Sequence, residues 1–100
     1  MMNKQFLKQA QQMQARLAQA QTEIEQAKVE GSAGGGVVKV VMTGKQVLES
    51  VTISPEAAQD VELLQDLILA AVNDASTKVQ DMVSKKMGAV TGGMKIPGLM

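Results

Sequence analysis

The feature that most constrains this chain is a long helical pattern over residues 61–87 whose apolar side narrows along its length. Its first half is apolar on nearly every face, whereas beyond Asn73 a narrow stripe remains, with Lys78, Lys85 and Lys86 between its apolar members. A helix that is apolar all round must be enclosed by protein, and a helix with one narrow stripe keeps its other side in solvent. The pattern predicts a helix rooted in a core with its far end projecting into solvent.

A heptad repeat predicts a second long helix over residues 3–28. The seam positions follow one another at alternating steps of three and four: Asn3, Phe6, Ala10, Met13, Leu17, Ala20, Ile24 and Ala27. This spacing is typical of a coiled-coil seam. Because several seam residues are alanines, a partner helix can approach closely but buries little area per layer. The many glutamines lie largely off the seam and are interpreted as a helix-forming, solvated surface.

The stretch between the two helices predicts a small antiparallel sheet. Residues 29–31 can begin a strand, residues 32–36 (SAGGG) are expected to form a mobile hairpin loop, and residues 37–43 and 46–53 form two strands joined at Gly44-Lys45. The glycine cluster is no phosphate-binding loop, because no Lys-Ser or Lys-Thr follows it and no helix begins after it. Both faces of these strands carry apolar residues, so the long helix can cover one face and a second subunit the other.

Helix-start signals follow the last strand. Ser54-Pro55-Glu56 combines a hydroxyl cap, a proline at the first helical position and an acid at the positive end of the helix dipole. Asp60 offers a second cap, so a short turn over residues 55–59 can precede the long helix. Within that helix, Asn73 and Asp74 interrupt the apolar pattern. Either they are a polar device that fixes register or caps a neighbouring loop, or they lie on the exposed side.

The expected fold is α+β in a single domain, residues 1–100: a helical arm (1–28), a three-stranded sheet (29–53), a long helix (54–90) and a flexible tail (91–100). The one aromatic residue is Phe6, so the core consists of small aliphatic side chains and methionine. Chains of this size with such cores are commonly stabilised by oligomerisation, and a homodimer is expected. The lack of cysteine, of a leader and of a membrane-spanning stretch favours a cytoplasmic protein without a membrane partner.

Enzymatic chemistry is not expected. The chain has no histidine and no cysteine, which removes the commonest metal ligands and general bases. The serines lack a plausible base, and the carboxylates are scattered among lysines and glutamines. We therefore expect no catalytic residue, no metal, no cofactor and no small-molecule substrate.

The charges are segregated although the formal net charge is zero. All ten acids lie between Glu23 and Asp81, where the only bases are four lysines, so this segment carries −6. The two ends hold six bases and no acid, so they carry +6. If the two helices pair antiparallel, the basic ends meet at the tip of one arm and the acids collect around its root.

Basic residues on two adjacent helices are suited to contact the phosphates of double-stranded DNA. The candidate DNA-binding residues are Lys4, Lys8, Arg16, Lys85 and Lys86, with Lys95 if the tail orders on binding. The arms have no aromatic cluster that could stack on bases, which argues against recognition of single strands or RNA. Three alternatives remain open: ordinary solubilising charge, a prefoldin-like holdase or adaptor that grips protein clients through apolar tips, and a structural dimer that docks a partner helix.

The sequence also resembles a known family along its whole length. The similar segments are residues 8–14 (KQAQQMQ), 36–40 (GVVKV), 51–55 (VTISP), 67–75 (LILAAVNDA) and 93–98 (GMKIPG). They resemble the YbaB/EbfC family of bacterial nucleoid-associated proteins. The resemblance implies a tweezer-like homodimer with projecting helical arms that binds DNA and takes part in nucleoid organisation or gene regulation. The chain departs from many relatives at Ser54, where an aspartate is common, and at Val47-Leu48-Glu49, where basic residues can occur; the second departure leaves the arm tips as the better candidates.

Overall fold

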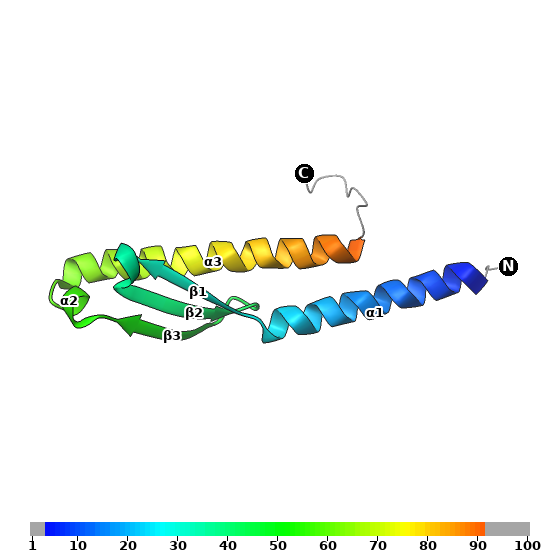
Figure 1. The fold of residues 1–100 in the computed structure, drawn as a ribbon, viewed down its shortest axis with the longest axis horizontal. Coiled ribbons are helices and arrows are strands. Elements are labelled where there is room, and N and C mark those ends of the chain that lie inside the picture. Colours follow the sequence, from blue (N-terminus) through cyan, green and yellow to red (C-terminus); the bar gives the residue numbers. More distant parts are fainter. Residues whose placement is uncertain (1–3, 92–100) are drawn as a thin grey trace.

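The computed structural model describes residues 4–91 and has an elongated shape of 70 × 25 × 16 Å (Figure 1). The elements, in chain order, are α1 (Lys4–Gln26), β1 (Lys28–Ala33), the 3₁₀ turn η1 (Gly34–Gly36), β2 (Val38–Thr43), β3 (Leu48–Ile53), α2 (Pro55–Ala58) and α3 (Val61–Thr91). The predicted α+β fold is confirmed: along the chain, a long helix precedes a three-stranded antiparallel sheet and a second long helix follows it.

The sheet has the order β1-β2-β3, with both pairs antiparallel. One face of β2 carries Val38, Val40 and Met42, which are buried against α3. Ala71, Ala75 and Val79 of α3 meet them from above and are also buried. The core is therefore a thin layer of small aliphatic side chains between one sheet face and one helix, as the composition predicts.

The cover that α3 gives to the sheet ends between β2 and β3. Val40 and Val51 are cross-strand partners, so their side chains lie on the same face. Val40 is fully buried, whereas Val51 is 42% exposed. On α3 itself, at least half of the surface of Val61, Leu63 and Leu69 is exposed. The expected enclosure of the first half of this helix is thus incomplete within one chain.

The first strand is longer than the sequence suggests. Residues 32 and 33 were expected in the loop, but Ser32 and Ala33 pair with Lys39 and Val38 in the ladder. The loop shrinks to Gly34–Gly36, and all three of these glycines have positive φ, a backbone conformation that glycine adopts without steric cost. The extra pairing depends on contacts with α3 that lie far away in the sequence. Likewise, α1 ends at Gln26 because Lys28 already belongs to β1.

Both predicted caps are present at the entry to the second helical region. The Ser54 hydroxyl accepts a hydrogen bond from the backbone N–H of Ala57 at 3.4 Å, and the Asp60 carboxylate accepts one from that of Leu63 at 3.1 Å. Each satisfies an N–H that the first helical turn leaves without a partner. The short helix α2 therefore precedes α3, in agreement with the two caps in the sequence.

Helix α1 runs toward the sheet and ends beside the start of β1. It is antiparallel to the second half of α3, and its first part extends past the end of α3 (Figure 1). Its seam is covered only in its second half, where Ala20 is buried and Leu17 and Ile24 are half-buried. Phe6 and Met13, earlier on the same seam, are 61% and 45% exposed. The heptad is therefore longer than the partner helix that the same chain supplies.

Candidate nucleic-acid interface

An open groove of about 360 Å³ lies between α1 and α3, in the half of the molecule that projects from the sheet. The residues that line it are Arg16, Gln19, Ala20, Glu23, Lys85, Lys86, Ala89 and Val90. Three of these residues, Ala20, Ala89 and Val90, are small and apolar. The others are polar and mostly basic. We refer to this site as the interhelical groove.

The groove brings together three of the six predicted DNA-binding residues. Arg16 comes from α1, and Lys85 and Lys86 come from α3, about 70 residues later in the sequence. The antiparallel course of the helices causes this convergence, since each helix contributes its charged turns to the same level of the arm. The predicted meeting of the basic ends is thus observed for these three residues.

Lys4 and Lys8 are not part of the groove. They lie on the exposed part of α1, toward its first residue. At 1.5 Å per residue, they are displaced from Arg16 by roughly 18 and 12 Å along the helix axis. They extend the basic surface along α1 rather than adding to the cluster. The sixth candidate, Lys95, lies outside the described residues.

The sequence analysis missed Glu23, the one acid that lines the groove within residues 4–91. One of its carboxylate oxygens accepts a hydrogen bond from the Lys86 ammonium at 3.3 Å. Arg16 and Glu23 are one heptad apart, and both occupy the position that directly precedes a seam residue, Leu17 or Ile24. Residues that flank a seam commonly form ion pairs with the facing helix. The heptad therefore contained the signal for Glu23.

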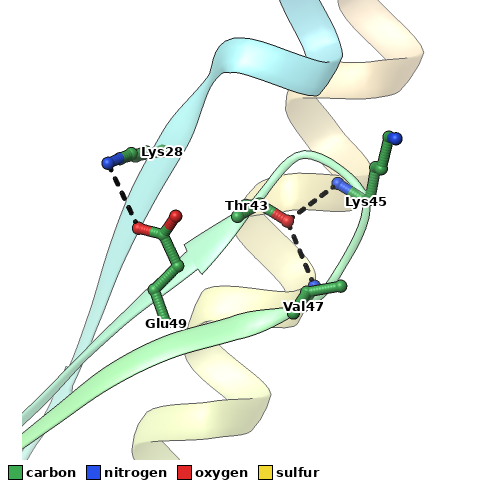
Figure 2. A network of polar contacts seen from close by, with 5 residues as sticks. All are labelled: Lys28, Thr43, Lys45, Val47 and Glu49. Atoms are coloured by element: carbon green, nitrogen blue, oxygen red, sulfur yellow. Dashed lines mark hydrogen bonds and ion pairs between the residues drawn. The ribbon is translucent and has the colours of Figure 1, made fainter.

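Two lysines near the sheet are paired with acids. Lys28 contacts Glu49 at 3.3 Å, as Figure 2 shows, and Lys45 contacts Glu25 at 3.9 Å. The turn that carries Lys45 is held by the Thr43 hydroxyl, which accepts hydrogen bonds from the backbone N–H groups of Lys45 and Val47, both at 3.2 Å (Figure 2). These pairs place positive charge next to negative charge at the root of the arm.

The arm differs from the root in this respect. Within residues 4–91, the cations that form no ion pair include Lys4, Lys8, Arg16 and Lys85, all on the projecting helices; on the sheet, Lys39 is also unpaired. Positive charge without an acidic partner thus collects on the arm. Such a surface attracts a polyanion because each contact neutralises a phosphate without first breaking an internal pair.

The structure separates the two polar residues in the middle of α3. Asn73 is exposed, whereas the Asp74 carboxylate accepts a hydrogen bond from the backbone N–H of Ser32 at 3.0 Å and pairs with Lys78 at 3.1 Å. The Ser32 N–H, followed by the Lys78 ammonium, holds the pKa of Asp74 below its usual value. Of the two interpretations, the polar device applies to Asp74, although it bonds to strand β1 rather than to a loop, and the exposed position applies to Asn73.

The described chain offers little else in the way of a functional site. Among residues 4–91 no group of three or more acidic side chains lies close enough together to hold a metal ion. In the same part of the chain no helix has both the length and the apolar character needed to cross a membrane. The interhelical groove, together with Lys4 and Lys8 on α1, remains the candidate site.

Comparisons with known proteins place the chain in a family. Residues 1–94 match the model of the YbaB/EbfC DNA-binding family. A nucleoid-associated protein of Desulforamulus reducens is 56% identical over 100 residues, covering 98% of this chain and 94% of that protein. One of Pelotomaculum thermopropionicum is 52% identical over 96 residues, covering 94% and 91%.

A solved structure agrees in fold. The crystal structure of an uncharacterized protein, HP0035, from Helicobacter pylori superposes with a TM-score of 0.75, covering 92% of this chain and 99% of that one, at 22% sequence identity. The family match and the close relatives agree with the resemblance seen in the sequence, and they describe a DNA-binding family rather than a family of enzymes. The chain belongs to the YbaB/EbfC DNA-binding family.

Proposed function

We propose that this chain acts as a homodimer that binds double-stranded DNA mainly through phosphate contacts from its arms, in nucleoid organisation or gene regulation. The residues proposed to make these contacts are Lys4, Lys8, Arg16 and Lys85, with Lys95. The remaining candidate, Lys86, differs from them because it is already paired with an acid, Glu23. The observation that carries the proposal is the contrast in pairing: Lys28 and Lys45 at the root have acidic partners, whereas Arg16 and Lys85 in the groove have none among the described residues.

Phosphate contact rather than base contact is favoured by the chemistry of the groove. It is lined by Lys and Arg side chains together with alanine and valine, and the one aromatic residue of the chain, Phe6, is not part of it. Cations of this kind neutralise phosphates with little regard to sequence, while single-strand recognition uses aromatic rings that stack on bases. The relatives named as nucleoid-associated proteins support the same target.

The proposed dimer is supported by the apolar surface that one chain leaves open. Val51 on β3 and Val61 and Leu69 on α3 are 42%, 62% and 64% exposed. Val51 lies on the strand that α3 leaves uncovered, and Val61 and Leu69 lie on α3 itself. A second copy that packs there would complete the core and carry a second arm. The two arms could then engage one duplex together.

Binding to unrelated duplexes over a range of salt concentrations tests the proposal. We expect affinity for all of them and a steep loss as salt rises. In Lys85→Ala the slope of log K against log salt should fall by about 0.9 for each arm engaged, because each arm loses one phosphate contact. Lys45→Ala is the matched control, since it removes a root lysine that pairs with Glu25. An equal fall in both variants, or no binding at low salt, would refute the assignment.

A second candidate, a holdase or helical adaptor for protein clients, is favoured by one observation. Phe6, Leu7 and Met13 expose apolar surface on α1, a helix whose first part extends past the end of α3 (Figure 1). Such a patch on a projecting helix suits contact with another protein. Suppression of client aggregation by a protein that shifts no duplex at low salt would favour this function over DNA binding.

A further inference from the structure

We propose that Glu23 withholds Lys86 from DNA, so that each arm binds phosphates with one cation fewer than its sequence contains. This inference rests on the proposed DNA-binding function and concerns how the same groove works. It starts from Glu23, the only acid among the described residues that line the groove, and from Lys86, with which that acid forms an ion pair.

The geometry gives Lys86 a partner that its neighbours lack. The Lys86 ammonium lies 3.3 Å from a carboxylate oxygen of Glu23, and both side chains line the groove. The Lys86 side chain is 34% exposed and that of Glu23 is 49% exposed, so the pair is partly removed from solvent. Ion pairs in such positions are screened by salt less than fully exposed ones. Arg16 and Lys85 line the same groove and have no ion-pair partner in the described chain.

A phosphate that approaches Lys86 meets two costs. It must replace the Glu23 carboxylate at the ammonium, and it must then lie within a few ångströms of that carboxylate, whose negative charge repels it. Neither cost applies at Lys85, its neighbour in the sequence. Lys86 and Glu23 together present about zero charge to the duplex, so this pair releases no counterion when DNA binds. The sequence of the arm is basic, but the positive charge of Lys86 is neutralised by Glu23 within the protein.

The position of Glu23 in the heptad explains why it is aimed at Lys86. It occupies the position that flanks the seam, seven residues after Arg16, and the seam itself is covered by α3 at Ala20. The side chain at this position is therefore held beside the facing helix rather than free to turn away. Arg16 holds the equivalent position one heptad earlier and carries the opposite charge. The same face of α1 thus presents one cation to solvent and one acid to α3.

Removing the acid should release the lysine. We expect Glu23→Gln to tighten DNA binding by about two- to fivefold per arm at low salt, the range that corresponds to one partly exposed ion pair. It should also steepen the slope of log K against log salt by about 0.9 per arm. Lys86→Gln in the native background should lower the slope much less than Lys85→Ala does, because this lysine releases no counterion while Glu23 is present; it should still weaken binding, since it leaves the Glu23 carboxylate without a partner.

The double variant separates a specific pair from a general change in charge. In the Lys86→Gln background, Glu23→Gln should no longer steepen the slope, since no lysine remains to be released. Glu25→Gln is the matched control: it removes the same charge two residues away on the same helix and also breaks an ion pair, with Lys45, outside the groove. It should leave the slope unchanged. Circular dichroism of each variant establishes that the helices are formed.

Each outcome of this experiment decides between the two proposals. If Glu25→Gln steepens the slope as much as Glu23→Gln does, or if Glu23→Gln acts equally with and without Lys86, the pair has no specific role and the inference is wrong, while DNA binding stands. If the wild-type protein fails to bind duplexes at low salt, the proposed function is refuted and the inference falls with it.

Discussion

Gly31 lies where the backbone of β1 comes closest to α3. A Cβ at this position would lie against the carbonyl oxygen of Ala71 and only 2.6 Å from the backbone nitrogen of Ala75. These two atoms belong to the helix backbone, and the third nearby atom is the Cβ of Ala75 at 2.7 Å. None of them belongs to a flexible side chain that could move aside. We expect Gly31→Ala to force β1 away from α3 and to lower the free energy of unfolding by about 1–3 kcal/mol, the usual cost of overpacking, as measured by urea denaturation.

Gly88 supplies the control for that experiment. It lies within α3, and a Cβ there meets nothing within 4 Å. Gly88→Ala should therefore raise the free energy of unfolding by up to about 1 kcal/mol through helix propensity alone. Equal effects of the two substitutions would show that the close approach at Gly31 does not constrain the fold.

Single residues also mark what the sequence could and could not predict. Ser54 and Asp60 are caps that act within three residues, and both were identified correctly. The role of Asp74 could not be decided, because its partner Ser32 is 42 residues away. Glu23 was missed because it belongs to the acidic segment of the sequence, although its heptad position places it on the same side of α1 as Arg16.

The contact between β1 and α3 is reinforced at the free edge of the strand. Asp74 accepts a hydrogen bond from the N–H of Ser32, and Lys78 donates one to the carbonyl of Glu30 at 3.1 Å. These two backbone groups belong to alternate residues of β1, whose other side pairs with β2. Two side chains of α3 thus satisfy an edge that would otherwise be open to pairing with another strand.

This contact should make stability depend on pH in the acid range. Because the pKa of Asp74 is lowered on folding from its usual 3.8, its ionised form stabilises the folded state. That contribution is complete above the unfolded-state pKa and is lost as the pH falls through the lower folded-state pKa. Asp74→Asn should therefore unfold at a lower temperature than the wild type near pH 7, and the difference should shrink below about pH 4.

Thermal unfolding followed by circular dichroism from pH 7 to pH 2.5 measures this difference. Asp81→Asn is a suitable control, because Asp81 is exposed on the same helix and forms no hydrogen bond or ion pair within residues 4–91. It should change the unfolding temperature little at any pH. A difference for Asp74→Asn that stays constant down to pH 2.5 would contradict the role of the ionised carboxylate.

Elements were predicted best where local signals define them. The heptad located α1, and the caps located α2 and α3. The end of β1 was placed too early, since glycine-rich sequence favours a loop, whereas Ser32 and Ala33 pair with β2 and the N–H of Ser32 also bonds to Asp74 on α3. The sequence also did not predict how much of the α1 seam α3 covers. That depends on how far α3 reaches along α1 and not on the heptad of α1 itself.

For the whole molecule, the segregation of charge along the sequence becomes a segregation in space. The sheet turns the chain so that α1 approaches it and α3 leaves it, and the two helices run side by side in opposite directions (Figure 1). Arg16, Lys85 and Lys86, from opposite ends of the sequence, therefore share one arm, and most of the acids lie near the sheet and the first half of α3. Glu23 on α1 and Asp81 on the second half of α3 are the exceptions. Element order alone predicted this arrangement. It did not predict that one of the arm's cations would be paired with an acid.

The open surface around β3 leads to a prediction for the assembly. Replacing Val51 and Leu69 together by glutamine costs little in one chain, since both side chains are about half exposed or more. Across a two-fold interface it would bury four amides without designed partners, at about 1–3 kcal/mol each. We expect the wild type to sediment at twice its mass of 10.6 kDa and the double variant to sediment as a monomer.

The same variant tests whether DNA binding uses two arms. A monomer carries one arm, so its slope of log K against log salt should be about half that of the wild type, although no charge has been changed. Phe6→Gln is the control, because it alters an equally exposed apolar residue on α1, away from β3. If Phe6→Gln dissociates the dimer and the Val51 and Leu69 variant does not, the subunits meet through the uncovered half of the α1 seam. The arms would then be joined at their tips, and a duplex could not lie between them.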